Sequence, residues 1–239
     1  KESGKLYADY ATGTVMPQVV ILAGGLGTRL GELSKTIPKS LISVSGKPML
    51  SHILEWAAGQ GCRRAVILTG HLGEQFEGFK HEGMDLTFVQ ESEQMGTGGA
   101  LLNAIDYLED EFILLWGDDY HPVNYRRLYA AHKEHGQSLT MTVIQSDQLV
   151  NLRHENGNVV EYSKSEISDT FNGYEAGTSV VNKSVLVSFG KSKIWSWEET
   201  VYPQLSGKIH AHIDETPFWD MGTPERLERL EEFFDNRRS

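Results

Sequence analysis

A β-branched run that stops at a cluster of glycines constrains the fold more than any other feature. Val19-Val20-Ile21-Leu22-Ala23 is apolar at every position, and Gly24-Gly25-Leu26-Gly27 follows it directly. An extended segment that is apolar on both faces must be covered on both sides, which is typical of parallel sheets. Glycines then let the backbone turn sharply and approach a ligand closely. We predict a buried strand that leads into a ligand-binding loop.

Similar segments recur in the first half of the chain. Short apolar runs predict further strands at Ala65–Thr69, Leu86–Val89 and Phe112–Trp116. Helical patterns lie between them: Pro48 to about Gln60, a stretch from Gly73, and Gly98 to Leu108. Buried strands that alternate with helices predict a mostly parallel sheet with helices on both faces.

The second half has looser spacing and predicts additional, mixed strands. The strand-like segments are Leu139–Ile144, Val159–Tyr162, Thr178–Asn182 and Ile209–Ile213. Thr223-Pro224 begins a final helix whose apolar stripe is Leu227, Leu230, Phe233 and Phe234. We therefore expect an α/β fold, a Rossmann-like and mostly parallel mixed sheet flanked by helices. Residues 1–16 are interpreted as an N-terminal extension or a remnant of cloning, and 17–239 as a single domain.

Charge and composition narrow the classes of partner. The 239 residues carry a formal net charge of −11, and the nearest candidates for a basic patch are three isolated arginine pairs, so a nucleic-acid backbone would be repelled. No apolar run approaches the roughly 18 residues that a membrane span needs. Cys62 is the only cysteine, which fits a reducing compartment. We expect a cytoplasmic protein without nucleic-acid or membrane partners; the sequence carries no signal for the oligomeric state.

Two cationic side chains follow the glycine loop. Arg29 offers a rigid fork of donors for phosphate oxygens, and Lys39 offers a mobile point charge. Two familiar phosphate-binding patterns do not match. A Walker loop requires Gly-Lys-Ser/Thr, but Thr28 and Arg29 follow Gly27. A Rossmann fingerprint requires glycine where Leu30 stands, and the acid that closes its second strand is missing.

Six short motifs occur in order and together resemble the sugar-1-phosphate nucleotidyltransferase family, which makes nucleotide-sugars. They are Gly24-Gly25-Leu26-Gly27-Thr28-Arg29-Leu30, Pro38-Lys39-Ser40-Leu41, Gly46-Lys47-Pro48-Met49-Leu50, Gly96-Thr97-Gly98-Gly99-Ala100, Gly117-Asp118 and Trp219-Asp220-Met221-Gly222-Thr223-Pro224. Ser40 stands where the family usually has a second proline. The resemblance covers nearly the whole chain and implies that family's fold, which is similar to glycosyltransferase A.

The resemblance also implies a reaction. A phosphate oxygen of a sugar 1-phosphate would displace pyrophosphate at the α-phosphorus of an NTP. Arg29 would bind the triphosphate tail, and Lys39 would stabilise the α-phosphate in the transition state, so both are expected to be catalytic. The residues expected to bind the nucleotide are Leu22, Ala23, Gly24, Gly25, Gly27, Thr28, Arg29, Glu91, Gly96, Thr97 and Gly98.

Two acids are the expected metal ligands. Asp118 follows a predicted strand through Gly117, and Asp220 lies about one hundred residues later. Mg²⁺ is usually held by one or two carboxylates together with substrate phosphates and water. The resemblance assigns Mg²⁺ to Asp118 and Asp220. Asp119 is expected to point away from the metal, because neighbouring residues of an extended segment face opposite sides.

The sugar side departs from the family pattern. Lys164, Glu175 and Gly177 are the expected sugar-binding residues. Ser163 stands where the family normally has glutamate, and Glu175 stands where asparagine is common. An unusual sugar is therefore plausible.

The segment before Gly96 most resembles the branch of the family that uses GTP with heptose 1-phosphate or mannose 1-phosphate, and Glu91 could accept a hydrogen bond from guanine. UTP, CTP and dTTP remain alternatives, as does a non-catalytic nucleotide-sugar sensor. An oxidoreductase is disfavoured by the missing fingerprint. His210 and His212 share one face of a predicted strand and could hold a metal, but a half-exposed strand explains them without one.

Overall fold

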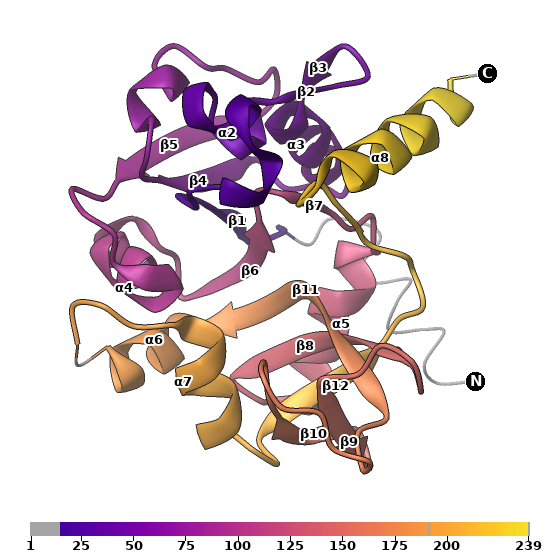
Figure 1. The fold of residues 1–239 in the computed structure, drawn as a ribbon. Helices are drawn as coiled ribbons and strands as arrows, with labels where there is room; N and C mark the ends of the chain where they lie inside the picture. The colour runs from indigo at the N-terminus through magenta and orange to yellow at the C-terminus, as the bar shows by residue number, and fades with distance from the viewer. Residues whose placement is uncertain (1–14, 191, 239) are drawn as a thin grey trace.

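A twisted mixed sheet forms the centre of the protein (Figure 1). In the computed structural model, which describes residues 15–190 and 192–238, this sheet has nine strands in the order β5-β4-β1-β6-β11-β8-β12-β10-β9. In chain order they are β1 Gln18–Ala23, β4 Arg64–Thr69, β5 Asp85–Gln90, β6 Glu111–Trp116, β8 Leu139–Gln145, β9 Leu152–Glu155, β10 Asn158–Tyr162, β11 Gly173–Asn182 and β12 Ile209–Ile213. Two small ribbons pair β2 Ser43–Val44 with β3 Lys47–Pro48, and β7 Asp119–Tyr120 with β13 Trp219–Asp220.

The direction of the strands divides the sheet. Strands β5, β4, β1 and β6 are parallel, and β11 pairs antiparallel with both β6 and β8. From β1 the chain builds outward through β4 and β5, then returns to the other side of β1 with β6. Strands β1 and β6 therefore flank a topological switch point, where open α/β sheets bind ligands at the carboxyl ends of the strands.

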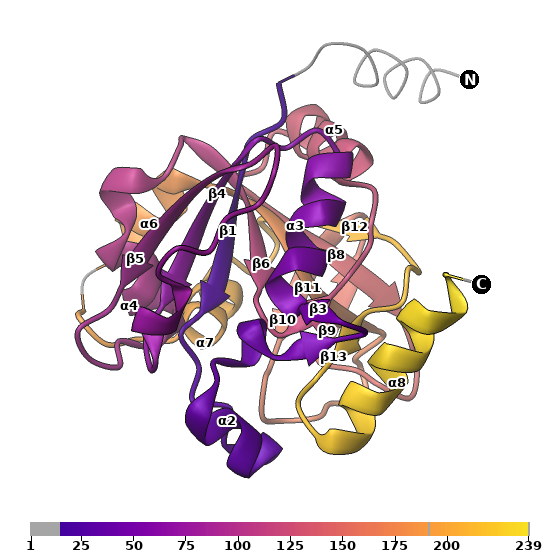
Figure 2. The same cartoon turned by 90° about the horizontal axis from the view of Figure 1, so that it is seen from above.

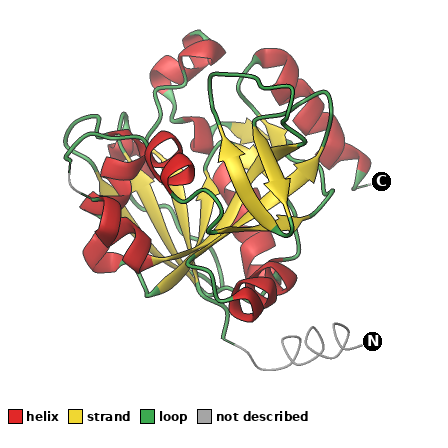
Figure 3. Ribbon diagram, turned by 90° about the horizontal axis from the view of Figure 1, so that it is seen from below, coloured by secondary structure: helices red, strands yellow, loops and turns green. Residues whose placement is uncertain are grey.

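Helices cover both faces of the sheet (Figures 2 and 3). The α-helices are α2 Glu32–Thr36, α3 Met49–Gly59, α4 Gly96–Asn103, α5 Tyr125–His135, α6 Lys183–Phe189, α7 Trp197–Gln204 and α8 Pro224–Asn236. Single 3₁₀ turns are η1 Thr28–Leu30, η2 Lys39–Leu41, η3 Gly73–Phe76 and η4 Ile105–Tyr107. Val19 and Ile21 of β1 pack in the cluster that includes residues of α3, α5 and α8, and Val20 packs with residues of α4, α6 and α7. This alternation is why β1 is apolar throughout.

The fold class predicted from the sequence is confirmed, and so are the predicted strands of the parallel half. Two predicted helices were wrong in extent. The stretch from Gly73 is only the 3₁₀ turn η3, and the segment from Gly98 to Leu108 breaks after Asn103 and continues as η4. Strand β11 begins at Gly173, earlier than predicted. Its first part was missed because a register shift between Glu175 and Ser179 interrupts the alternation of apolar and polar residues.

The edges of the described chain bear on two other expectations. Residues 1–14 of the expected extension lie outside the described residues, but Met16 is buried in the same core cluster as β1. Within residues 15–190 and 192–238, no helix is long and apolar enough to cross a membrane.

The buried His210 should make the unfolding free energy depend on pH. Burial, and then the nearby His135 and His212, lower the pKa of His210 from 6.5 to about 4. Between these values the unfolded chain binds a proton that the folded chain does not, so stability is lost as the pH falls. We predict that the unfolding free energy of His210→Asn falls less steeply with acid, by up to about 1.4 kcal/mol per pH unit. Urea titrations between about pH 7 and pH 5 measure this slope. The exposed His71→Asn is the control, and parallel curves for all three proteins would contradict the prediction.

Candidate active site

A cavity of about 390 Å³ opens at the carboxyl ends of β1 and β6. The two strands are joined there by the backbone N–H of Gly117, which donates to the carbonyl of Leu22 at 2.8 Å. The cavity is lined by Leu22, Ala23, Gly24, Gly25, Lys39, Ser40, Glu91, Gln94, Gly96, Thr97, Ala100, Trp116, Gly117 and Asp118. Most of the residues expected to bind nucleotide therefore meet in one place. Gln94 and Trp116 were not predicted, although Trp116 ends a predicted strand.

The glycine loop and the lysine segment fit against one another. Gly27 has a left-handed backbone (φ 64°), and a Cβ there would lie 2.9 Å from the side chain of Lys39. A Cβ on Gly24 would lie 3.2 Å from a carboxylate oxygen of Glu91. A larger residue at Gly24 would therefore crowd Glu91, and one at Gly27 would crowd Lys39, and both of these side chains line the cavity.

Four predicted nucleotide-binding residues lie outside the cavity wall: Gly27, Thr28, Arg29 and Gly98. Thr28 and Arg29 are exposed on η1. The guanidinium of Arg29 approaches Gly222, since its Nη2 lies 3.9 Å from where a Cβ on that glycine would stand. Arg29 is thus beside the Asp220 segment, at the rim where a triphosphate tail could extend.

An ion pair crosses the site. The Nζ of Lys39 donates to Oδ2 of Asp118 at 3.0 Å. The lysine side chain is 15% exposed and the aspartate 36% exposed, so the pair lies at the wall of the cavity within reach of solvent. The two groups neutralise one another here. A bound phosphate would offer Lys39 another anion and would free a hard oxygen ligand on Asp118.

The second predicted metal ligand lies beside the first. Strands β7 and β13 pair Asp220 with Asp119, and the N–H of Met221 donates to the carbonyl of Asp118 at 3.2 Å. The carboxylate of Asp220 accepts from the N–H of Gly222 at 2.8 Å and from Nη1 of Arg226 at 3.1 Å. Asp220 is not part of the cavity wall, but its backbone lies beside that of Asp118, and each of the two acids is paired with a cation.

This donor set fits Mg²⁺ that is shared with substrate. Among the described residues, no group of three or more His, Cys, Asp or Glu side chains could hold a metal ion. Two carboxylates with phosphate oxygens and water are the usual environment of Mg²⁺, which rarely has an all-protein cage. Asp118 and Asp220 supply such a pair.

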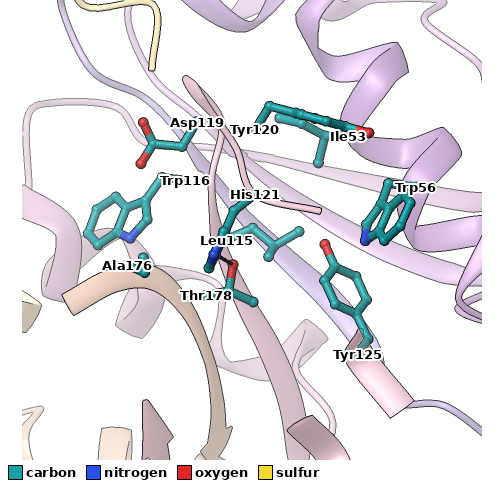
Figure 4. A pocket seen from close by; sticks show the side chains of 11 residues that line it. Ile53, Trp56, Leu115, Trp116, Asp119, Tyr120, His121, Tyr125, Ala176 and Thr178 are labelled. Atoms are coloured by element: carbon teal, nitrogen blue, oxygen red, sulfur yellow. Dashed lines mark hydrogen bonds between the residues drawn. The ribbon is translucent and has the colours of Figure 1, made fainter. Parts of the chain in front are cut away.

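Asp119 faces a different hollow from Asp118. It lines a small void of about 10 Å³ together with Trp116 and Gly177 (Figure 4). Burial raises the pKa of Asp119 well above its usual range, and the charges of Asp118 and Asp220 raise it further. Asp119 therefore lines a hollow other than the main cavity, and its burial beside two other acids favours the neutral, protonated form of its carboxyl group.

The loop at Gly96 to Gly99 is shaped by the segment that packs on it. A Cβ on Gly98 would lie 2.3 Å from the ring of Trp195, and the N–H of Gly98 donates to the Trp195 carbonyl at 3.0 Å. Thr97 Oγ1 donates to the buried Glu198 at 2.9 Å and accepts from the N–H of Trp197 at 2.8 Å. The N–H of Gly98 is thus committed within the protein, and Gly96 and Thr97 remain as the part of this loop that faces the cavity.

The predicted sugar-binding residues lie near one another but not in the wall of the main cavity. Gly177 has φ 93° and donates its N–H to Oε1 of Glu175 at 2.7 Å. Burial raises the pKa of Glu175 to about 7, against the lowering effects of that hydrogen bond and of the charge on Lys164. Lys164 itself is exposed. The bulge of β11 therefore presents a carboxyl group that is poised to change protonation near neutrality.

The alternative metal pair has a structural role. The ring of His210 stacks on His135 with centroids 3.7 Å apart, and His212 lies 3.9 Å from Asp214. In the part of the chain that the structure describes, neither histidine belongs to a group of three or more side chains that could hold a metal ion. The histidines are thus part of the packing between α5 and β12.

Known proteins are similar to this chain in sequence and in fold. The model of the nucleotidyl transferase family matches residues 18–169. The D-glycero-alpha-D-manno-heptose 1-phosphate guanylyltransferase of Aneurinibacillus thermoaerophilus is 26% identical over 220 residues, which cover 87% of this chain and 94% of the relative. The mannose-1-phosphate guanylyltransferase catalytic subunit beta of Drosophila melanogaster is 31% identical over 87% of this chain, but the match covers only 60% of that longer relative.

A solved structure is similar over nearly the same length. HddC from Yersinia pseudotuberculosis superimposes with a TM-score of 0.78 at 28% identity, covering 92% of this chain and all of that one. The same protein complexed with GMP-PN gives a TM-score of 0.77.

The packing at Gly98 generates a stability prediction. Gly98→Ala places a methyl group against the ring of Trp195, so we expect it to lower the unfolding free energy by about 1–3 kcal/mol. Gly25→Ala is the matched control, because nothing lies within 4 Å of a Cβ there. Chemical denaturation of both variants measures the difference. Equal stabilities would contradict the role of the Trp195 contact.

Proposed function

The chain belongs to the nucleotidyl transferase family, and we propose that it transfers a nucleoside monophosphate from an NTP to a sugar 1-phosphate. The products are pyrophosphate and an NDP-sugar. The observation that carries this proposal is the Lys39–Asp118 pair at the wall of a cavity formed by the glycine loop. It sets a phosphate-binding cation beside a metal-binding carboxylate at the sheet's switch point.

The reaction is an in-line displacement. An oxygen of the sugar phosphate forms a bond to the α-phosphorus as the bond to the β-phosphate oxygen breaks, and the electron pair leaves with pyrophosphate. The attacking oxygen is already ionised near neutral pH, so no general base is required. Catalysis then depends on positioning and on the neutralisation of charge.

Each cationic and acidic group has a role in this scheme. Lys39 exchanges Asp118 for the α-phosphate and stabilises its charge in the transition state. Arg29, from the rim, neutralises the β- and γ-phosphates. Asp118 and Asp220 would hold Mg²⁺, which when bound would supply positive charge that offsets the negative charge of the phosphates.

We propose GTP as the donor and heptose 1-phosphate or mannose 1-phosphate as the acceptor. Support comes from relatives named as guanylyltransferases for these two sugars and from the GMP-PN complex of HddC. Glu91 lines the cavity, and in this proposal its carboxylate accepts a hydrogen bond from the donor edge of guanine. A cytoplasmic location fits the free, buried Cys62. There are two competing hypotheses: an enzyme that uses UTP, CTP or dTTP as the donor, and a sensor that binds nucleotide-sugar without turnover.

Release of pyrophosphate distinguishes these hypotheses. The purified chain is assayed with GTP, UTP, CTP, ATP and dTTP, each against sugar 1-phosphates that include D-glycero-D-manno-heptose 1-phosphate and mannose 1-phosphate. We expect the highest kcat/KM with GTP and one of these two sugars. A preference for UTP or CTP would overturn the choice of base, and no release with any pair would favour the sensor.

A single substitution tests the role of Lys39. Lys39→Ala removes a preorganised donor that acts on the transition state, so kcat should fall by about two to three orders of magnitude with little change in the KM for GTP. Lys35→Ala is the matched control, because Lys35 pairs only with exposed Glu32 on the surface. A normal kcat with a raised KM would show that Lys39 contributes only to substrate binding.

A further inference from the structure

A buried histidine joins three segments next to the proposed metal ligands. The ring of His121 follows β7 and is 7% exposed. Its Nδ1 lies 2.9 Å from Oγ1 of Thr178 on β11 (Figure 4). Its Nε2 lies 3.2 Å from the carbonyl oxygen of Thr216. The ring also meets Phe218 edge to face, with centroids 6.3 Å apart.

The partners define which nitrogen carries the proton. A carbonyl oxygen only accepts, so Nε2 of His121 must donate to Thr216. In the neutral ring Nδ1 then accepts from the hydroxyl of Thr178. Burial lowers the pKa of His121 to about 4, against weaker raising effects of Thr216 and Asp214, so the ring is neutral near pH 7. Each nitrogen therefore has one role.

The Thr216 segment leads directly to Asp220. Strand β13, which contains Asp220, pairs with β7 over only two residues. Such a short ribbon is marginal on its own. The backbone N–H of Met221, directly after β13, also donates to the carbonyl of Asp118 at 3.2 Å. The His121–Thr216 bond is thus an independent anchor on the segment that carries the second acid.

The other partner lies next to the bulge of β11. Thr178 follows Gly177, whose N–H holds the carboxyl of Glu175. Thr142 Oγ1 donates to the carbonyl of Thr178 at 2.6 Å and fixes it to β8. The His121 ring therefore links the segment that carries Asp220 to the central sheet, through one hydrogen bond to Thr216 and one to Thr178.

We propose that His121 is a positioning residue that sets the distance between Asp220 and Asp118 and thereby the affinity of this pair for a divalent cation. The proposal rests on the proposed function for the role of the two acids. Mg²⁺ requires near-ideal octahedral geometry with short bonds, so a small displacement of one carboxylate weakens binding. His121 itself touches neither acid in the hydrogen bonds of the described residues.

Two variants with amide side chains separate the hydrogen bond to Thr216 from the one to Thr178. The side-chain nitrogen of glutamine reaches about as far as Nε2 of histidine, so His121→Gln can still donate to Thr216. The shorter His121→Asn reaches Thr178 but not Thr216. Both variants remove the imidazole, so they are matched for the loss of the ring.

Binding of Mn²⁺ alone, measured by the loss of its free paramagnetic resonance signal, is the primary readout. We expect His121→Asn to raise the Kd for Mn²⁺ about fivefold or more, and His121→Gln to stay within about twofold of the wild type. Hydrogen exchange of residues 214–221 should accelerate in the asparagine variant alone. In the turnover assay, the Mg²⁺ concentration for half-maximal rate should follow the same order.

Several outcomes overturn the proposal. Unchanged Mn²⁺ affinity in His121→Asn, with faster exchange or a lower melting temperature, would reduce His121 to a structural role. Equal losses in both variants would show that the Thr216 bond does not set the affinity. If His121→Asn fails to fold, a second pair of variants tests the same ring. Thr178→Val removes the hydroxyl that donates to Nδ1 of His121 and leaves the ring in place, whereas Thr178→Ser keeps a hydroxyl at this position. We then expect about threefold weaker Mn²⁺ binding for valine only; equal binding by both would contradict the proposal.

The proposed function fails separately. A wild-type protein that releases no pyrophosphate but shows the predicted order of Mn²⁺ affinities would reject the reaction and retain His121 as the positioning residue.

Discussion

The pairing of β1 with β6 is the constraint on which the site depends. Leu22 lies opposite Trp116, and the ladder continues through the N–H of Gly117 to the carbonyl of Leu22. A Cβ on Gly117 would lie only 3.0 Å from that carbonyl oxygen, so the close approach requires glycine. Because both strands end at the same level, the glycine loop after β1 and Asp118 after β6 lie beside one cavity.

Electrostatics adapt this scaffold to an anionic ligand. Asp118 is held by Lys39 and Asp220 by Arg226, so each acid has a cation before any ligand arrives. Arg226 is about half exposed, and exposed pairs of this kind contribute about 1 kcal/mol or less. Lys39 is largely buried, so it would leave Asp118 only for another anion such as a phosphate oxygen. The chain has a net charge of −11, but Lys39, Arg29 and Arg226 lie beside the two acids, where the proposed function requires positive charge for the phosphates.

The sequence predicted the parallel half of the sheet well because its strands are apolar on both faces and end at glycines. Prediction was weaker where contacts are distant in sequence. Helices α6 and α7 were missed, and the shape of the Gly96 loop depends on Trp195, about one hundred residues away. No local pattern indicates that His121 bonds Thr178 and Thr216. The family match at residues 18–169 covers five of the six recognised motifs, and the motif that contains Asp220 lies beyond it; the roles of individual site residues are proposals.

The central claim is that the acids after β6 and on β13 hold one divalent cation together with a nucleotide in the cavity. A crystal structure with Mn²⁺ and a non-hydrolysable GTP analogue tests it most directly, through the anomalous scattering of the metal. The account predicts one strong peak between the carboxylates of Asp118 and Asp220, with Lys39 moved from Asp118 onto a phosphate oxygen. A nucleotide bound in the cavity with the metal elsewhere, or with Lys39 still paired to Asp118, would contradict it.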